Sequence, residues 1–221
     1  MGNFNPDSFR KYFNEKIRKA VSEIMLKEDI QEIRLRSGKP LSVSVLGKEK
    51  FVTENGKITA YPQLGMIIEK DDIEYSFKAI CDYSVHSFSK ELSQGFITIN
   101  GGHRVGICGT AVISEGKIET VKYISGLNFR IARQILGCAD EIIKYIDIEN
   151  PKGILIIGPP SSGKTTVLRD LCRQLSSRNR VSLIDERGEI AAVHQGNPQN
   201  DIGYSTDVFN GYPKGEGILT A

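Results

Sequence analysis

The feature that most constrains the fold is a glycine-rich loop set between an apolar run and an amphipathic segment. The run Gly153–Ile157 leads into GPPSSGKTT, which fits G-x-x-x-x-G-K-[ST] from Gly158 to Thr165. A short continuous apolar run is typical of a buried parallel strand, and leucines at helical spacing follow the loop. This order of strand, loop and helix predicts an α/β P-loop domain, with Gly153–Ile157 as its buried strand.

The chemistry of triphosphate binding needs these residue types at these positions. Glycines let a tight loop turn its backbone N–H groups inward, and the helix that follows offers its amino-terminal dipole to the anion. We expect Lys164 to reach the β- and γ-phosphates of ATP and Thr165 to give its hydroxyl to Mg²⁺. The residues predicted to contact the nucleotide are Gly158, Pro159, Pro160, Ser161, Ser162, Gly163, Lys164, Thr165 and Thr166.

An acidic pair follows the next apolar strand. Val181–Ile184 ends in Asp185-Glu186, the form of a Walker B element, in which the Asp binds Mg²⁺ and the Glu polarises the attacking water. Only one crossover helix separates this strand from Lys164, whereas the Walker B strand comes later in many P-loop ATPases. Three interpretations therefore stay open: a Walker B element, another acidic contact near the nucleotide, or a structural acid pair.

The chain before the loop alternates between helical and strand periodicity. We predict a small α+β domain with an antiparallel sheet over residues 1–125, a linker over 126–137, and the first part of the P-loop domain over 138–221. The expected elements are a helix over 7–26, a hairpin over 33–45, helical segments over 71–92 and 139–146, and strands over 96–99, 104–113 and 118–124.

The composition is that of a soluble globular protein. Charged residues make up 25%, and 29 Lys and Arg against 27 Asp and Glu leave a net charge of +2, so nothing demands nucleic acid or an anionic membrane as partner. The four cysteines and three histidines are too scattered to predict a disulfide or a metal site. No apolar run approaches the length of a membrane span, and no secretory signal opens the chain, which favours the cytoplasm.

Several longer stretches resemble the sporulation stage III AA family of endospore-forming bacteria, relatives of the type II and type IV secretion ATPases. GGHRVGICG and SGLNFRIAR are specific to this group, whereas the P-loop is widely shared. The stretches that carry the resemblance are EIRLRSGKPLSV at 32–43, GFITINGGHRVGICGTAV at 95–112, ISGLNFRIAR at 124–133, GPPSSGKTT at 158–166 and LIDERGEIA at 183–191.

The resemblance implies a PAS-like α+β domain ahead of a RecA-like motor domain that works as a hexameric ring. It implies an ATPase on the inner face of the cell membrane, acting with membrane proteins of a secretion-type channel between mother cell and forespore. It places an acidic box at Asp185–Ile190, with Glu186 and Glu189 as candidates. Many relatives have Glu-Asp where this chain has Asp-Glu, so the acid that faces the metal is left open. Arg130 and Arg133 are the candidate arginines near the nucleotide, with structural ion pairs as the alternative.

A RecA-like core needs several more strands than residues 166–221 can supply, so we expect the sequence to be a fragment with weak or no ATP turnover. Two other functions remain as alternatives. One is a P-loop ATPase that binds single-stranded nucleic acid, although the basic-aromatic pattern of such proteins is missing. The other is a small-molecule kinase, against which the long α+β leader argues. Stimulation by single-stranded nucleic acid would favour the first alternative, and phosphoryl transfer to a small acceptor would favour the second.

Overall fold

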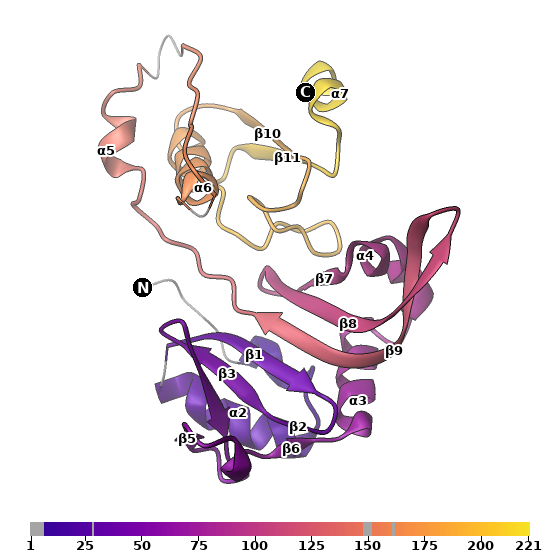
Figure 1. Ribbon diagram of the computed structural model, residues 1–221. Coiled ribbons are helices and arrows are strands. Elements are labelled where there is room, and N and C mark those ends of the chain that lie inside the picture. The colour runs from indigo at the N-terminus through magenta and orange to yellow at the C-terminus, as the bar shows by residue number, and fades with distance from the viewer. Residues whose placement is uncertain (1–6, 28, 148–151, 161) are drawn as a thin grey trace. The chain divides into compact units, whose positions relative to one another are not determined.

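The computed structural model describes residues 7–27, 29–147, 152–160 and 162–221, and the chain divides into two compact units. Of the described residues, those from 7 to 132 form the N-terminal unit, and those from 133 to 221 form the C-terminal unit (Figure 1). Each unit has its own sheet. The mixed α/β character predicted from the sequence is confirmed.

A seven-stranded antiparallel sheet organises the N-terminal unit, in the order β5-β4-β3-β1-β9-β8-β7. Its longest strands, β8 and β9, form a hairpin that extends beyond their neighbours (Figure 1). The strands are β1 (Ile30–Arg36), β3 (Ser42–Val45), β4 (Lys48–Val52), β5 (Ile58–Thr59), β7 (Phe96–Ile99), β8 (His103–Ser114) and β9 (Lys117–Arg130). A separate pair joins β2 (Lys39–Pro40) to β6 (Ile67–Ile68).

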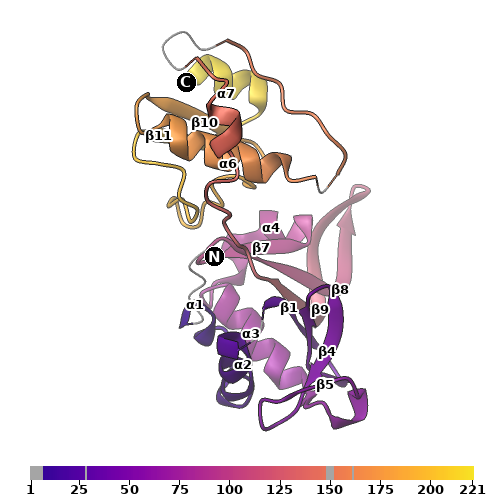
Figure 2. The same cartoon turned by 90° about the vertical axis from the view of Figure 1, so that its left-hand side faces the viewer.

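One face of this sheet carries the core of the unit. In β1, Ile33 and Leu35 are fully buried while Arg34 and Arg36 lie on the opposite face, as the alternation of the sequence predicts. Helices α2 (Glu15–Lys27) and α3 (Lys70–Ile80) lie along the buried face (Figure 2). One face of the sheet is therefore packed against helices, and the opposite face carries polar side chains, as is common in antiparallel sheets.

The predicted helix over 7–26 is two helices, α1 (Asp7–Arg10) and α2. Asn14 lies just before α2, and its side-chain Oδ1 accepts the N–H of Ile17 at 3.1 Å. Such an N-cap starts a new helix. The apolar spacing continues through the break, which is why periodicity alone did not locate it.

The helical segment predicted over 71–92 is also divided. It forms α3, the 3₁₀ turn η2 (Val85–Phe88) and α4 (Ser89–Gln94), and a further 3₁₀ turn, η1, covers Pro62–Leu64. Asp82 and Tyr83 follow α3 with positive φ angles of 45° and 59°. A left-handed backbone cannot continue a right-handed helix, so α3 ends there.

The C-terminal unit is built on a helix and two parallel strands. A small core of Cys172, Leu183, Ile190, Ala191 and Ile202 lies among these elements. The elements are α5 (Asp140–Ile143), α6 (Lys164–Leu175), β10 (Val181–Asp185), β11 (Thr206–Asn210) and α7 (Lys214–Thr220), with β10 paired to β11 in parallel. The helix predicted over 139–146 is therefore reduced to the short α5.

The prediction of a buried strand over Gly153–Ile157 is wrong for this structure. Residues 152–158 form no strand, and Ile154, Leu155 and Ile157 are 53%, 84% and 80% exposed. A strand of this kind is buried only between paired neighbours. Within the described residues, the sheet of the C-terminal unit has only β10 and β11, and neither pairs with this run.

Among the residues that the structure describes, no helix is both long and apolar enough to cross a bilayer.

Candidate nucleotide-binding site

The glycine-rich loop, residues 158–165, turns tightly before α6. Gly163 has a φ of 87°, a left-handed conformation that favours glycine, and helix α6 begins at the next residue. A Cβ on Gly158 would lie 2.8 Å from Ser162 Oγ, closer than real Cβ contacts. The backbone conformation therefore favours glycine at position 163, whereas a side chain at position 158 would require the Ser162 hydroxyl to rotate away. We call this segment the phosphate loop.

Backbone N–H groups that precede the helical hydrogen bonds mark the start of α6. The first helical bond runs from the N–H of Val167 to the carbonyl of Gly163, at 2.9 Å. The N–H groups of Lys164, Thr165 and Thr166 therefore precede the helical ladder, where an anion can accept them. This donor set, at the positive end of a helix dipole, fits the phosphates of a nucleotide.

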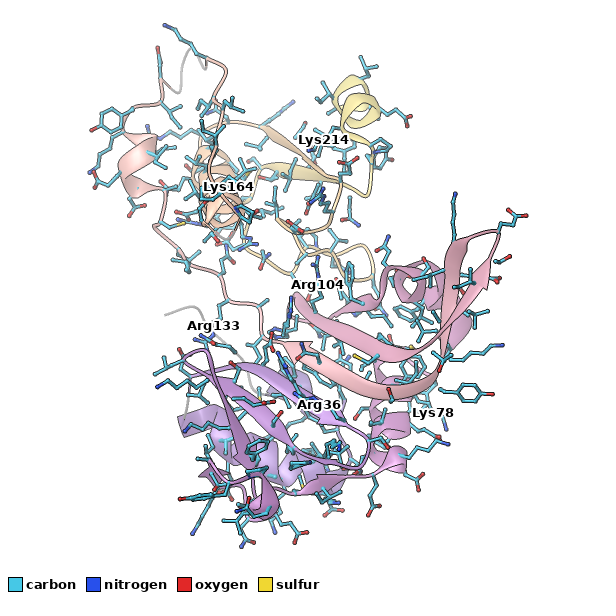
Figure 3. All side chains as sticks on the ribbon, in the orientation of Figure 1. Arg36, Lys78, Arg104, Arg133, Lys164 and Lys214 are labelled. Atoms are coloured by element: carbon cyan, nitrogen blue, oxygen red, sulfur yellow. The ribbon has the colours of Figure 1, made fainter. Side chains whose placement is uncertain are left out.

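Lys164 folds back over the phosphate loop. Its Nζ, at the start of α6 (Figure 3), donates to the carbonyls of Gly158 at 2.9 Å and Pro159 at 2.6 Å. The ammonium group thus lies against the loop that is predicted to hold phosphate. Of the other predicted contacts, Pro159, Pro160 and Ser162 are exposed and Thr165 and Thr166 half-buried, while Ser161 lies outside the described residues.

Asp185, a candidate metal ligand from the sequence, binds the backbone instead. Its side chain is buried, and its carboxylate accepts N–H groups at 3.0, 2.9 and 2.9 Å. The donors are Glu189, Ile190 and Ala191. The structure therefore favours the structural interpretation of Asp185, as the acceptor that closes the turn after β10.

Arg169 holds the same turn from the side of α6. Its Nε donates to the carbonyl of Ile190 at 2.8 Å, and its Nη2 to the carbonyl of Glu189 at 2.6 Å. The acidic turn is thereby fastened to the helix that begins at the phosphate loop. The sequence offered no signal for this contact, because an arginine on a helix is most often solvated.

Glu186 and Glu189 are the accessible acids of the turn. Both are exposed, and the Glu186 carboxylate lies 3.9 Å from Lys214 Nζ, a distance at which solvent weakens the pair. Unlike Asp185, neither carboxylate accepts a backbone N–H in the bonds recorded for the described residues. Solvent therefore reaches both of these carboxylates.

The two candidate arginines lie in different units. Arg130, at the end of β9, donates to the Glu32 carboxylate at 3.0 Å, and Arg133 begins the C-terminal unit with an exposed side chain. Burial raises the pKa of the Glu32 carboxyl, but Arg34 and Arg130 outweigh it and leave the pKa below its ordinary value. Arg130 therefore already has a structural ion pair.

The chain matches a known family over nearly its whole length. The family model described as "Sporulation stage III, protein AA" matches residues 6–221. Stage III sporulation protein AA of Bacillus subtilis (strain 168) is 34% identical over 213 residues, covering 93% of this chain and 66% of that protein. Protein SEEDLING PLASTID DEVELOPMENT 1 of Arabidopsis thaliana is 29% identical over 135 residues, covering 60% of this chain and 18% of that protein.

The fold is shared with a solved motor protein. The crystal structure of the pilus retraction motor PilT with bound ADP matches 89% of this chain and 52% of that chain, with a TM-score of 0.52 at 16% identity. The Legionella pneumophila ATPase DotB matches 94% of this chain and 51% of that chain, with a TM-score of 0.45 at 18% identity. The chain thus spans about two thirds or less of the relatives it matches.

Proposed function

Because the chain belongs to the sporulation stage III protein AA family, we propose that it binds ATP with Mg²⁺ and acts as a motor-type ATPase. The observation that carries the proposal is the junction of phosphate loop and helix. There the backbone N–H groups of residues 164–166 lie at the amino terminus of α6, together with the Lys164 ammonium group, which now donates to loop carbonyls. The fold similarity to a pilus retraction motor with bound ADP supports the same function.

Different residues of the site are proposed to bind the nucleotide and to promote its hydrolysis. Lys164 exchanges the carbonyls of Gly158 and Pro159 for phosphate oxygens, and Thr165 gives its hydroxyl to the metal. Bound Mg²⁺ neutralises phosphate charge. Glu186 and Glu189, the exposed acids of the turn after β10, orient water near the metal, while Asp185 and Arg169 keep that turn in place.

The wider assembly is part of the same proposal. We infer a hexameric ring at the inner face of the cell membrane, which couples hydrolysis to the assembly or operation of a secretion-type channel in sporulation. Membership of a sporulation family supports the process, and the shared fold of a pilus motor supports the mechanism. Arg130 and Arg133 are proposed to approach the nucleotide in this assembly.

Calorimetry with ATP and Mg²⁺ tests the site. Lys164→Ala removes the side-chain cation of the phosphate loop, and one charge-assisted bond to phosphate contributes about 1.5–3 kcal/mol. We expect ATP affinity to fall by roughly ten- to a hundredfold. Lys117→Ala, at the start of β9 in the other unit, is the matched control and should leave affinity unchanged.

Two results would overturn the proposal. Equal affinity of wild type and Lys164→Ala would mean that the loop does not hold the phosphates. Strong stimulation of ATP turnover by a single-stranded oligonucleotide would replace the secretion role with a nucleic-acid one.

A further inference from the structure

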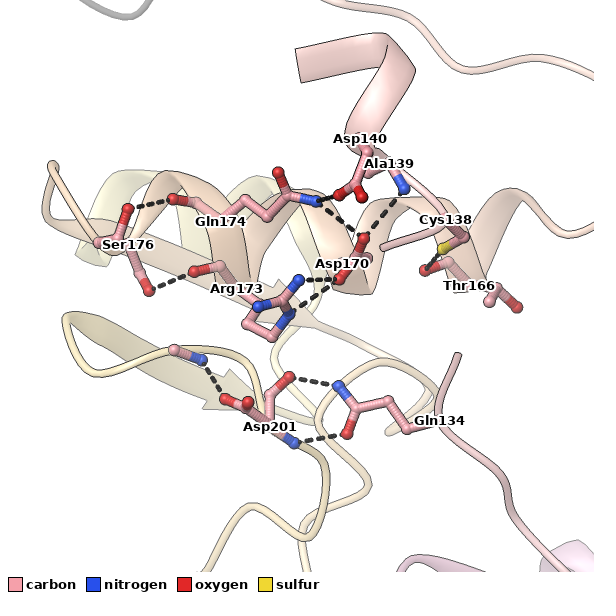
Figure 4. A network of polar contacts seen from close by, with 12 residues as sticks. Gln134, Cys138, Ala139, Asp140, Thr166, Asp170, Arg173, Gln174, Ser176 and Asp201 are labelled. Atoms are coloured by element: carbon pink, nitrogen blue, oxygen red, sulfur yellow. Dashed lines mark hydrogen bonds and ion pairs between the residues drawn. The ribbon is translucent and has the colours of Figure 1, made fainter. Parts of the chain in front are cut away.

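One face of α6 contacts the turn that leads into α5. Thr166, Asp170 and Gln174 follow one another at four-residue spacing, so they share one face of the helix. Residues 138–140 contact these three positions in turn, as Figure 4 shows. The segment therefore runs along three successive turns of the helix that starts at the phosphate loop.

Asp170 is the centre of this contact. It is 1% exposed, and its carboxylate accepts the N–H of Ala139 at 2.9 Å, the Gln174 amide at 2.9 Å and the Arg173 guanidinium at 2.7 and 2.8 Å. Burial raises the pKa of the Asp170 carboxyl, but these donors and the backbone at Gly137 outweigh it, so the pKa lies below its ordinary value. The charge is thus present at neutral pH and fully partnered.

The turns on either side of Asp170 also contact the segment. Nearer the phosphate loop, the thiol of Cys138 lies 3.5 Å from the carbonyl of Thr166. Nearer the end of α6, Gln174 Nε2 donates to Asp140 Oδ1 at 2.8 Å. Because Thr166 belongs to the first turn of α6, the segment touches the part of the helix next to the phosphate loop.

A second anchor lies at the start of the segment. The side chain of Gln134 donates to the carbonyl of Asp201 at 2.5 Å and accepts the Asp201 N–H at 2.8 Å. Arg133 immediately precedes Gln134 in the chain. The backbone that carries Arg133 is therefore fastened to the C-terminal unit at both ends of segment 134–140.

We propose that Asp170 is a positioning residue that couples occupancy of the phosphate loop to segment 134–140, and through that segment to Arg133. This inference rests on the proposed binding of ATP. Lys164 must leave the carbonyls of Gly158 and Pro159 to reach phosphate, which changes the partners of the first turn of α6. Asp170 follows on the same unbroken helix and holds Ala139, so the change reaches the segment directly.

Hydrogen–deuterium exchange on this chain, with and without saturating ATP and Mg²⁺, tests the coupling. In the wild type, ATP should slow exchange at residues 162–166 and also at residues 137–140. In Asp170→Asn, we expect the amides of 137–140 to exchange at least about tenfold faster, since the charged acceptor is lost. ATP should still protect the phosphate loop of this variant but no longer change residues 137–140.

The response to ATP separates coupling from simple stabilisation. A purely structural role would speed exchange in Asp170→Asn and keep the ATP effect at 137–140, which would overturn the proposal. Asp140→Asn is the matched control, since it alters one exposed bond of the same network and should keep that effect. If Asp170→Asn does not fold, the exchange data on the wild type alone can still refute the coupling. Protection of 162–166 without protection of 137–140 would refute the coupling, and protection of neither would refute the proposed nucleotide binding itself.

Discussion

Two buried carboxylates of the C-terminal unit accept hydrogen bonds from the backbone. Asp170 and Asp185 are both almost fully buried, and each accepts main-chain N–H groups from a segment that packs on α6 or follows β10. An ionised acid can remain buried only when such donors replace its water. Acids in this unit are therefore better assigned by what they touch than by their position after a strand.

Exchanging Asp185 for Asn tests this assignment. The amide keeps one acceptor oxygen, so its NH2 group would face at least one of the three backbone N–H groups that the carboxylate now accepts, and an unsatisfied buried donor costs about 1–3 kcal/mol. We expect Asp185→Asn to lower the free energy of unfolding by about 3 kcal/mol. Glu186→Gln, on the exposed neighbour, should stay within about 0.5 kcal/mol. Urea denaturation measures both. A stable Asp185→Asn variant that loses Mg²⁺-dependent ATP binding would make Asp185 a metal ligand.

His103 gives the N-terminal unit a defined acid response. The ring is buried 4.3 Å from that of Phe9, its Nδ1 accepts the Ala132 N–H at 3.0 Å, and burial lowers its pKa to about 4. The unfolded chain, with a His pKa near 6.5, binds more protons in this window, so stability falls as pH drops from about 6.5 to 4.

The expected loss over that window is about 3 kcal/mol, and His103→Asn should remove it. An Asn side chain can keep an acceptor for the Ala132 N–H without titrating. Chemical denaturation at pH 7, 5.5 and 4.5 measures the effect. Equal pH dependence in wild type and variant would show that other groups control the acid response.

At the scale of elements, the sequence predicted what local pattern determines. Strand β7, the β8–β9 hairpin and helix α6 follow from alternation, turn glycines and the motif. The helix break at Asn14 and the exposure of residues 153–157 could not be predicted from local pattern, because each depends on partners distant in the chain. Periodicity identifies an apolar face, but only a tertiary neighbour decides whether that face is buried.

A bulge in the β8–β9 hairpin depends on one glycine. The register shifts between Cys108 and Thr110, and a Cβ on Gly109 would lie 2.7 Å from the Lys122 carbonyl oxygen. Because that oxygen belongs to the paired backbone, Gly109→Ala should lower the free energy of unfolding by about 1–3 kcal/mol. Gly106→Ala, in the same strand, meets no atom closer than 3.7 Å and is the matched control. An equal effect of the two substitutions in thermal denaturation would contradict this account.

At the scale of the molecule, the sequence located the phosphate loop but missed what surrounds it. The loop is contiguous in the chain, so the motif formed by its glycines, Lys164 and Thr165 can be recognised in the sequence. Asp170, Arg169 and the segment before α5 are brought to the helix by the fold, through contacts 20 to 31 residues apart in the chain. Asp170, a charged residue within an amphipathic helix, was the one sequence feature that could have indicated these contacts.

The two units differ in the size of their cores, which predicts how the molecule unfolds. The N-terminal unit buries one face of a seven-stranded sheet, whereas the described part of the C-terminal unit has a two-stranded sheet and a small apolar cluster around Leu183. A two-stranded sheet contributes little stability alone, so we expect the C-terminal unit to unfold first, in a separate transition. Calorimetric scans of the chain would resolve two peaks.

ATP should act on that first transition alone. A ligand at about 100 times its Kd stabilises the state that binds it by about 2.7 kcal/mol, which raises the midpoint of a small unit by several degrees. The shift requires the phosphate loop, so Lys164→Ala should show two peaks but a much smaller response at the same ATP concentration. The upper peak, from the unit that contains His103, should stay in place in both proteins. A single transition, or an upper peak that moves with ATP while the lower one does not, would contradict independent cores with the nucleotide held by the C-terminal unit.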